Sequence, residues 1–119
     1  MWQFARVLTQ QIYNVTRHGS FSKDYGLRDQ IRRASVSIMA NIAEGFERGG
    51  RKEFLQFLSM AKGSNGELKS HLYVDLDQNY IAQNEFDNLL QETEKIGGKI
   101  GGLINYLRKT DIRGSKYKL

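Results

Sequence analysis

The sequence contains no cysteine and no proline among its 119 residues. Without cysteine the protein has no disulfide, no thiol nucleophile and no cysteine-based metal site, a composition that suits a reducing compartment. Long apolar runs are also missing, and the start Met1-Trp2-Gln3-Phe4 lacks the basic residues and the apolar stretch of a signal peptide. We therefore expect a cytoplasmic protein that does not bind membranes.

Histidine is scarce, with two residues in the whole chain. Four-helix bundles that hold two iron ions use Glu-x-x-His pairs, and neither His18 nor His71 has a glutamate three positions before it. His71 follows Glu67 by four residues, so both lie on one helical face, where Glu44 from another helix could join them. This single cluster favours a buried, hydrogen-bonded Glu and His over a metal site, and we expect neither metal nor cofactor.

Catalytic motifs are missing as well. The chain has no Gly-x-Ser-x-Gly elbow for a nucleophilic serine. The segment Gly97-Gly98-Lys99-Ile100-Gly101-Gly102 does not match a phosphate loop, which ends in Gly-Lys-Ser/Thr where a strand leads into a helix. The sequence predicts no catalytic residues and a protein that is not an enzyme.

Apolar residues recur at helical spacing in four segments, and a chain of this length forms one domain. The first segment spans about residues 2–17, the third 51–76 and the fourth 84–109. The second begins at Ser22 or Asp24 and ends at about residue 48. Phe4 and Leu8 lie on the apolar face of the first segment. Gly19 should end this helix, with His18 in its last turn. We expect an all-α, up-down-up-down antiparallel four-helix bundle over residues 1–109, followed by a basic, flexible C-terminal tail over 110–119.

Glycines interrupt two of these helical patterns. Gly63 and Gly66 flank Ser64-Asn65 in the third segment, and two glycine pairs occupy residues 97–102 of the fourth. Each interior glycine costs roughly 0.8 to 1 kcal/mol relative to alanine. Close approach of another backbone could offset this cost, so we expect close packing at Gly63 and Gly66. At the two glycine pairs of the fourth segment, we favour a site where another helix or another subunit crosses this helix over a simple kink.

The second segment carries a row of polar residues beside its apolar face. Burying such groups without partners costs roughly 1 to 3 kcal/mol each, so they should contact a neighbouring helix, another subunit or a ligand. We favour a structural contact with the third segment and keep the ligand site as the alternative. The expected row consists of Gln30, Ser37, Asn41 and Glu44, with Arg48 at its end and Ser64 and Glu67 as partners.

The same segment carries a resemblance to a known family. Arg32-Arg33-Ala34, Ser37-Ile38 and Asn41-Ile42-Ala43-Glu44-Gly45 resemble the signature of the four-helix-bundle proteins encoded by intervening sequences in bacterial 23S ribosomal RNA genes. Ala61-Lys62-Gly63-Ser64 with Glu67-Leu68 is similar to that family's Ala-x-Gly-Ser-x-x-Glu-Leu, and Trp2, Tyr13 and Tyr25-Gly26-Leu27 fit its opening pattern. The chain departs from the family in lacking prolines around Phe21-Ser22 and at Met39.

The resemblance implies a homo-oligomer. The family is similar to the accessory variability determinant of diversity-generating retroelements, a pentameric ring of four-helix bundles that works with a reverse transcriptase and RNA. A homo-oligomeric ring, with five subunits as the first choice, is therefore the expected assembly. RNA or DNA and a nucleic-acid enzyme are the expected candidate partners.

The net charge of +5 is unevenly distributed. Residues 1–53 carry nine Lys and Arg against five Asp and Glu, residues 54–107 carry four against seven, and residues 108–119 carry five against one. This asymmetry favours a polyanionic partner, although a solvated basic surface would look the same. The candidate nucleic-acid-binding residues are Arg28, Arg32, Arg33, Arg48, Arg51, Lys52, Arg108, Lys109, Arg113, Lys116 and Lys118.

No helix-turn-helix, RNA-recognition or zinc-finger signature accompanies these basic residues. The hypothesis is therefore a non-catalytic, oligomeric, nucleic-acid-associated accessory protein that binds RNA through basic surfaces. The alternative is a structural or protein-interaction module that binds no nucleic acid.

Overall fold

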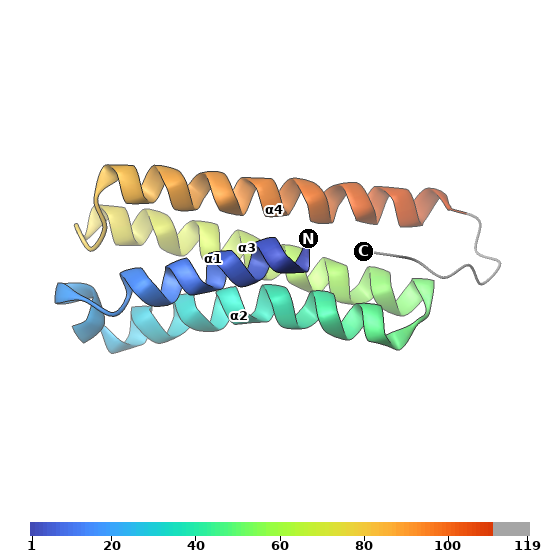
Figure 1. The fold of residues 1–119 in the computed structure, drawn as a ribbon, viewed down its shortest axis with the longest axis horizontal. Helices are drawn as coiled ribbons and strands as arrows, with labels where there is room; N and C mark the ends of the chain where they lie inside the picture. Colours follow the sequence, from blue (N-terminus) through green and yellow to red (C-terminus); the bar gives the residue numbers. More distant parts are fainter. Residues whose placement is uncertain (111–119) are drawn as a thin grey trace.

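The computed structural model describes residues 1–110, which form four α-helices and one short 3-10 helix. The elements are α1 (Trp2–Val15), η1 (Gly19–Lys23), α2 (Tyr25–Arg48), α3 (Arg51–Asp77) and α4 (Gln83–Lys109). Consecutive helices run in opposite directions, and each packs against the next, with α4 also contacting α1 (Figure 1). This confirms the predicted all-α four-helix bundle.

Local hydrogen bonds explain where the helices begin and end. The Asp24 side chain accepts a hydrogen bond of 3.2 Å from the Leu27 N–H and caps α2, one of the two caps expected. Gly49 ends α2 with a φ of 77°, a left-handed conformation that glycine adopts without strain. In contrast, α1 ends at Val15 with Thr16 as its C-cap, so His18 lies beyond the helix rather than in its last turn.

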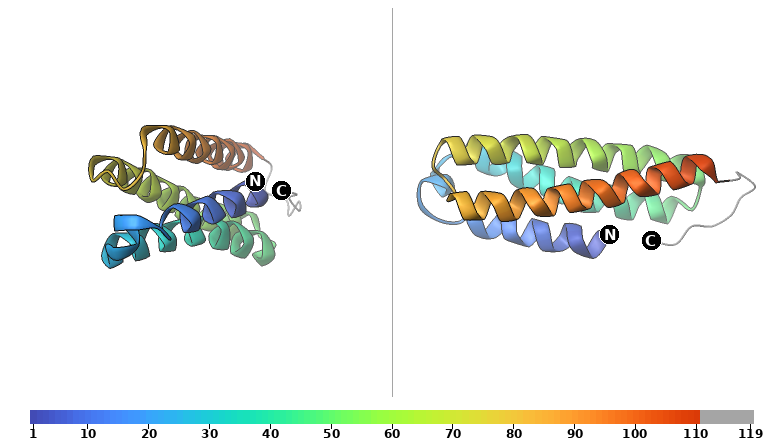
Figure 2. Two further views of the ribbon diagram at one scale, coloured as in Figure 1. Left: turned by 60° about the vertical axis from the view of Figure 1, so that its left-hand side comes forward. Right: turned by 90° about the horizontal axis from the view of Figure 1, so that it is seen from above.

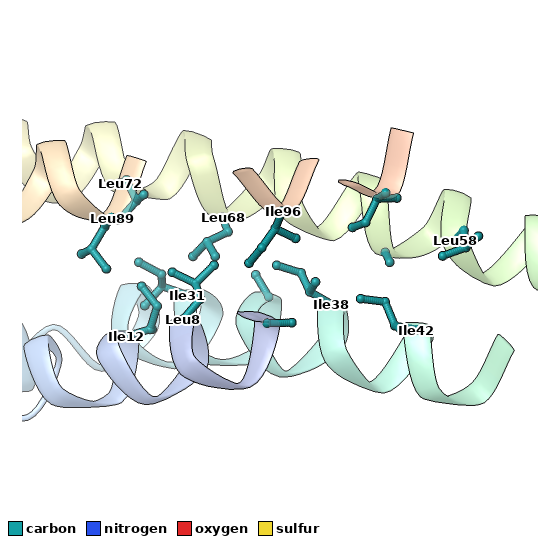
Figure 3. Close-up of a cluster of buried hydrophobic side chains, with 14 of the residues drawn as sticks. Leu8, Ile12, Ile31, Ile38, Ile42, Leu58, Leu68, Leu72, Leu89 and Ile96 are labelled. Carbon is teal, nitrogen blue, oxygen red and sulfur yellow. The ribbon is translucent and has the colours of Figure 1, made fainter. Parts of the chain in front are cut away.

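The core is a continuous column of aliphatic side chains along the bundle axis (Figure 3). α1 contributes Leu8 and Ile12. The other helices contribute Ile31, Ile38 and Ile42 from α2, Leu58, Leu68 and Leu72 from α3, and Leu89 and Ile96 from α4. None of the helices in residues 1–110 has the length and apolarity that spanning a membrane requires.

The first helix covers only part of the bundle. α1 has 14 residues and α3 and α4 have 27 each, which correspond to about 21 Å and about 40 Å. The N-terminus therefore lies near the middle of the bundle (Figure 1; Figure 2, right). At this edge Phe4 is 39% exposed beside Lys95 and Lys99, so its prediction as a core residue is wrong.

Most interior glycines are not sites of close packing within the chain. α3 is continuous through Gly63 and Gly66, but both are exposed, and a Cβ at either would meet nothing within 4 Å, so the expected close packing there is wrong. In α4, a Cβ added at Gly97 would lie 3.0 Å from Asn65 Nδ2, so α4 and α3 approach closely at this position. Gly98, Gly101 and Gly102 have open space in the described part of the chain.

Candidate nucleic-acid interface

Two arginine and tyrosine pairs lie on the surface where α1 and η1 meet the beginning of α2. The guanidinium carbon of Arg32 lies 4.6 Å from the ring centre of Tyr13, and that of Arg28 lies 4.9 Å from the ring centre of Tyr25. Such cation–π contacts hold a planar cation against an aromatic ring. Because Arg28 and Arg32 are four residues apart on α2, they occupy one helical face, about 6 Å apart along the axis.

Hydrogen bonds fix these two arginines. Arg32 Nε donates to Thr16 Oγ1 at 2.7 Å, and Thr16 is itself fully buried and bonded to the Ile12 carbonyl. Arg28 Nη1 donates to the Ser22 carbonyl at 3.1 Å, and its Nε pairs with Asp29 at 3.1 Å. The guanidinium planes are therefore held before any ligand binds, which lowers the entropy cost of binding.

A hollow of about 390 Å³ lies at this surface and is lined by Tyr13, Asp29, Arg32, Arg33 and Val36. Arg33 is exposed, and Asp29 is the one acidic residue of the lining, so the hollow is positively charged overall. The structure thus brings together three predicted residues, Arg28, Arg32 and Arg33. Tyr13 and Tyr25 were not predicted to belong to the site. We call these five residues the Arg–Tyr surface.

The other predicted binding residues within residues 1–110 lie at the opposite end of the bundle, at the end of α2, the start of α3 and the end of α4; they are Arg48, Arg51, Lys52, Arg108 and Lys109. Arg33 and Arg48 are 15 residues apart on α2, which is about 22 Å along the axis. Arg48 pairs with Glu44 at 3.0 Å and lies over the Phe57 ring. The predicted basic residues of the described chain therefore fall into two groups that are separated by most of the length of α2.

Arg51 has a structural role at that far end. Its Nε donates to the Leu107 carbonyl at 2.6 Å and its Nη2 to the Arg108 carbonyl at 3.2 Å. These are carbonyls of the last turn of α4, which have no partner within the helix and favour a cation. Arg51 thus holds the end of α4 against the start of α3. Lys52, Arg108 and Lys109 are exposed nearby, whereas Arg113, Lys116 and Lys118 of the predicted tail lie outside the described residues.

The predicted polar row is formed only at its centre. Ser37 Oγ and Ser64 Oγ are 2.8 Å apart and join α2 to α3, as expected, and Asn41 Nδ2 donates to the Ser37 carbonyl at 2.9 Å. Gln30 and Glu44 are exposed, so their expected burial is wrong. Glu44 instead meets Arg48 in solvent, where its carboxylate avoids the cost of desolvation.

Glu67 also stays on its own helix. Its carboxylate lies 3.2 Å from His71 Nε2, with the Glu67 side chain 55% exposed, and it does not contact the row on α2. The expected Glu and His pair is present, but its glutamate is not buried. In the part of the chain that the structure describes, no three His, Asp or Glu side chains come together in an arrangement suited to a metal ion.

A buried carboxyl group that the sequence analysis missed lies near the beginning of α2. Asp75 of α3 has no exposed surface, and neither of its oxygens has a hydrogen-bond partner among the described residues. Burial raises the pKa of Asp75 to about 7, and the nearby Asp24 carboxylate also raises it. Asp24 Oδ2 accepts a hydrogen bond of 2.9 Å from Tyr80, whose ring stacks on Phe21. This network joins η1 to the turn between α3 and α4.

Solved structures show the same fold. The crystal structure of a protein of unknown function from the S23 ribosomal protein family of Bacteroides thetaiotaomicron superposes with a TM-score of 0.81 at 21% sequence identity. The similarity covers 87% of this chain and 94% of the other. No curated protein matches the chain.

The family comparison confirms the resemblance found in the sequence. The pattern of the 23S rRNA-intervening sequence protein family matches residues 1–102, which is most of the chain and includes all the residues of the Arg–Tyr surface. The chain therefore belongs to the 23S rRNA-intervening sequence protein family.

Proposed function

We propose that this protein is a non-catalytic, homo-oligomeric accessory protein that binds nucleic acid, and that RNA is its preferred ligand. The observation that carries this proposal is the Arg–Tyr surface, where three arginines of α2 gather beside two tyrosines. Arginine binds phosphate oxygens through a planar fork of donors and stacks on rings. RNA comes before DNA because the family resembles accessory proteins that work with a reverse transcriptase and RNA.

The two ends of the bundle contribute differently to this function. At the Arg–Tyr surface, Arg33 is exposed and lies in the hollow. At the far end, Arg51 already donates to carbonyls of α4 and Arg48 already pairs with Glu44. Phosphate binding by Arg48 or Arg51 would have to displace these contacts, which leaves Lys52, Arg108 and Lys109 as the exposed basic residues at that end. We expect the Arg–Tyr surface to provide most of the affinity, because it combines the exposed Arg33 with planar groups on which bases can stack.

Salt dependence of binding tests the proposal. We expect a labelled single-stranded RNA to bind in fluorescence anisotropy at about 50 mM salt, with the logarithm of affinity falling linearly with the logarithm of salt concentration. Arg33→Gln should weaken binding and reduce that slope by about 0.7, the value for one phosphate contact on a single strand. Arg48→Gln is the matched control on the same helix and should change the slope much less.

Absence of binding to any RNA or DNA at about 50 mM salt would overturn the proposal, since nonspecific attraction is strong at low ionic strength. The protein would then be a protein-interaction module. That second function is favoured by Phe4 and Val7, apolar side chains of α1 that are 39% and 52% exposed. Exposed apolar groups of this kind occur at contacts between proteins.

The homo-oligomer, with five subunits as the first choice, has its own support. Gly98, Gly101 and Gly102 together cost α4 roughly 2 to 3 kcal/mol relative to alanine, yet none approaches another part of the described chain. A neighbouring subunit packed on these glycines would offset that cost. In a ring, the few basic groups of each chain are repeated around an axis, which strengthens binding to a long polyanion.

Light scattering tests the assembly. We expect the protein to behave as a pentamer at micromolar concentration, and Gly98→Leu to give smaller species that keep their helical circular dichroism, because the added side chain would separate the packed surfaces. Gly63→Leu, at an equally open position of α3, should leave the mass unchanged. A monomer for the unmodified protein would contradict the expectation.

A further inference from the structure

The hollow of the Arg–Tyr surface has planar groups in its wall. Tyr13 and Arg32 both line it, and the guanidinium of Arg32 lies over the Tyr13 ring. We propose that this hollow holds an unpaired base of a single-stranded nucleic acid, so that the protein prefers single strands to duplexes. The proposal rests on the proposed function and names the form of nucleic acid that the surface selects.

Stacking is the interaction that the wall offers. Unpaired bases of RNA stack on aromatic rings and on guanidinium planes, and each base has a planar face for this purpose. In a duplex these faces are covered by neighbouring base pairs, so no base could stack on the planar groups that line the hollow. The hydrogen bond from Arg32 Nε to Thr16 keeps the guanidinium in place, and a fixed plane loses little entropy when a base stacks on it.

The charges of the hollow favour a base over a phosphate at its centre. Asp29 lines the hollow, and its side chain is 55% exposed, so a phosphate placed there would meet a carboxylate of the same sign. A base is neutral, and its N–H groups can donate hydrogen bonds to a carboxylate. Arg33, on the same lining, is then available to the phosphate of the same nucleotide.

A second planar platform lies one helical turn away. Tyr25 is 64% exposed, and Arg28 lies over its ring, while the hydrogen bond to the Ser22 carbonyl holds the guanidinium. The two platforms lie on the same face of α2, about 6 Å apart along its axis. The four-residue spacing of Arg28 and Arg32 would allow neighbouring bases of one strand to stack on the two platforms.

An abasic oligonucleotide separates stacking from charge. We expect a 12-nucleotide single-stranded RNA to bind on the order of 10-fold more tightly than an abasic strand of equal length and charge, and more tightly than a 12-base-pair duplex, in anisotropy at about 50 mM salt. Equal affinity for the RNA and the abasic strand would overturn this inference and leave the proposed function intact. Absence of binding to all three would overturn both.

Charge-conserving variants test the two platforms. Arg32→Lys keeps the positive charge but removes the plane, so it should lower affinity for the RNA several-fold with an unchanged salt slope, whereas Arg33→Lys should have little effect. Tyr25→Ala should also weaken binding, and Tyr106→Ala, at a position equally exposed on α4, is its control. Because Tyr25 is largely exposed, its removal should leave the thermal unfolding midpoint nearly unchanged. Unaltered binding by both Arg32→Lys and Tyr25→Ala would contradict the inference.

Discussion

Replacing Asp75 by asparagine is expected to stabilise the bundle at neutral pH. Asp75 is fully buried on the core face of α3, and neither carboxylate oxygen has a hydrogen-bond partner among the described residues. A charge at this position lies close to the Asp24 carboxylate, which repels it. Asparagine has nearly the same shape and carries no charge, so Asp75→Asn removes the repulsion and the cost of burying a charge.

The effect should depend on pH in a defined window. Burial raises the pKa of Asp75 from 3.8 to about 7, so the folded protein keeps a proton that the unfolded chain has lost. Stability therefore falls as pH rises from about 4 to about 7 and changes no further through this group above that range. The full shift corresponds to on the order of 4 kcal/mol. Asp75→Asn lacks this loss, so its advantage over the unmodified protein should grow across the window.

Urea unfolding at a series of pH values measures this advantage. The two proteins should differ little in free energy of unfolding near pH 4 and by several kcal/mol above pH 7. Asp77→Asn is the matched control, because Asp77 ends the same helix but is exposed. A constant difference between Asp75→Asn and the unmodified protein from pH 4 to pH 8 would show that the carboxyl group is not protonated in the fold.

Asp75 also shows which kind of information the sequence holds. Leu68, Leu72 and Asp75 follow one another at spacings of four and three, so the pattern that placed the leucines in the core also places the aspartate there. The four helices could be predicted because each buries a periodic apolar face. Burial of the aspartate was missed because charged residues are seldom found fully buried.

Contacts between helices are harder to obtain from the sequence. The basic residues of the Arg–Tyr surface were identified from charge, but Tyr13 joins Arg32 only because α1 and α2 pack at one particular register. Arg51 was assigned to phosphate, although its partners are carbonyls 56 and 57 residues further along the chain. Such pairings depend on where helices cross and on the loops between them, which a periodic pattern does not specify.

Gly45 marks one of these crossings, and substituting it is expected to destabilise the bundle. A Cβ added at Gly45 would lie 2.7 Å from Phe57 Cβ and 3.1 Å from Phe54 Cδ1. Phe57 Cβ is bonded to the backbone, so relief of this clash requires α3 to move away from α2. We expect Gly45→Ala to lower the free energy of unfolding by about 1 to 3 kcal/mol, the usual cost of overpacking a core.

The sign of this change separates close packing from helix propensity. Alanine stabilises a helix interior by roughly 0.8 to 1 kcal/mol relative to glycine, so a glycine without close neighbours should gain from the same substitution. Gly63 of α3 is such a position, with open space around an added Cβ, and Gly63→Ala should raise the free energy of unfolding by about that amount. Urea unfolding of the two variants should therefore shift the midpoint in opposite directions. If Gly45→Ala were instead as stabilising as Gly63→Ala, α2 and α3 would have to lie further apart at this crossing, and the helix contact at Gly45 would not limit their approach.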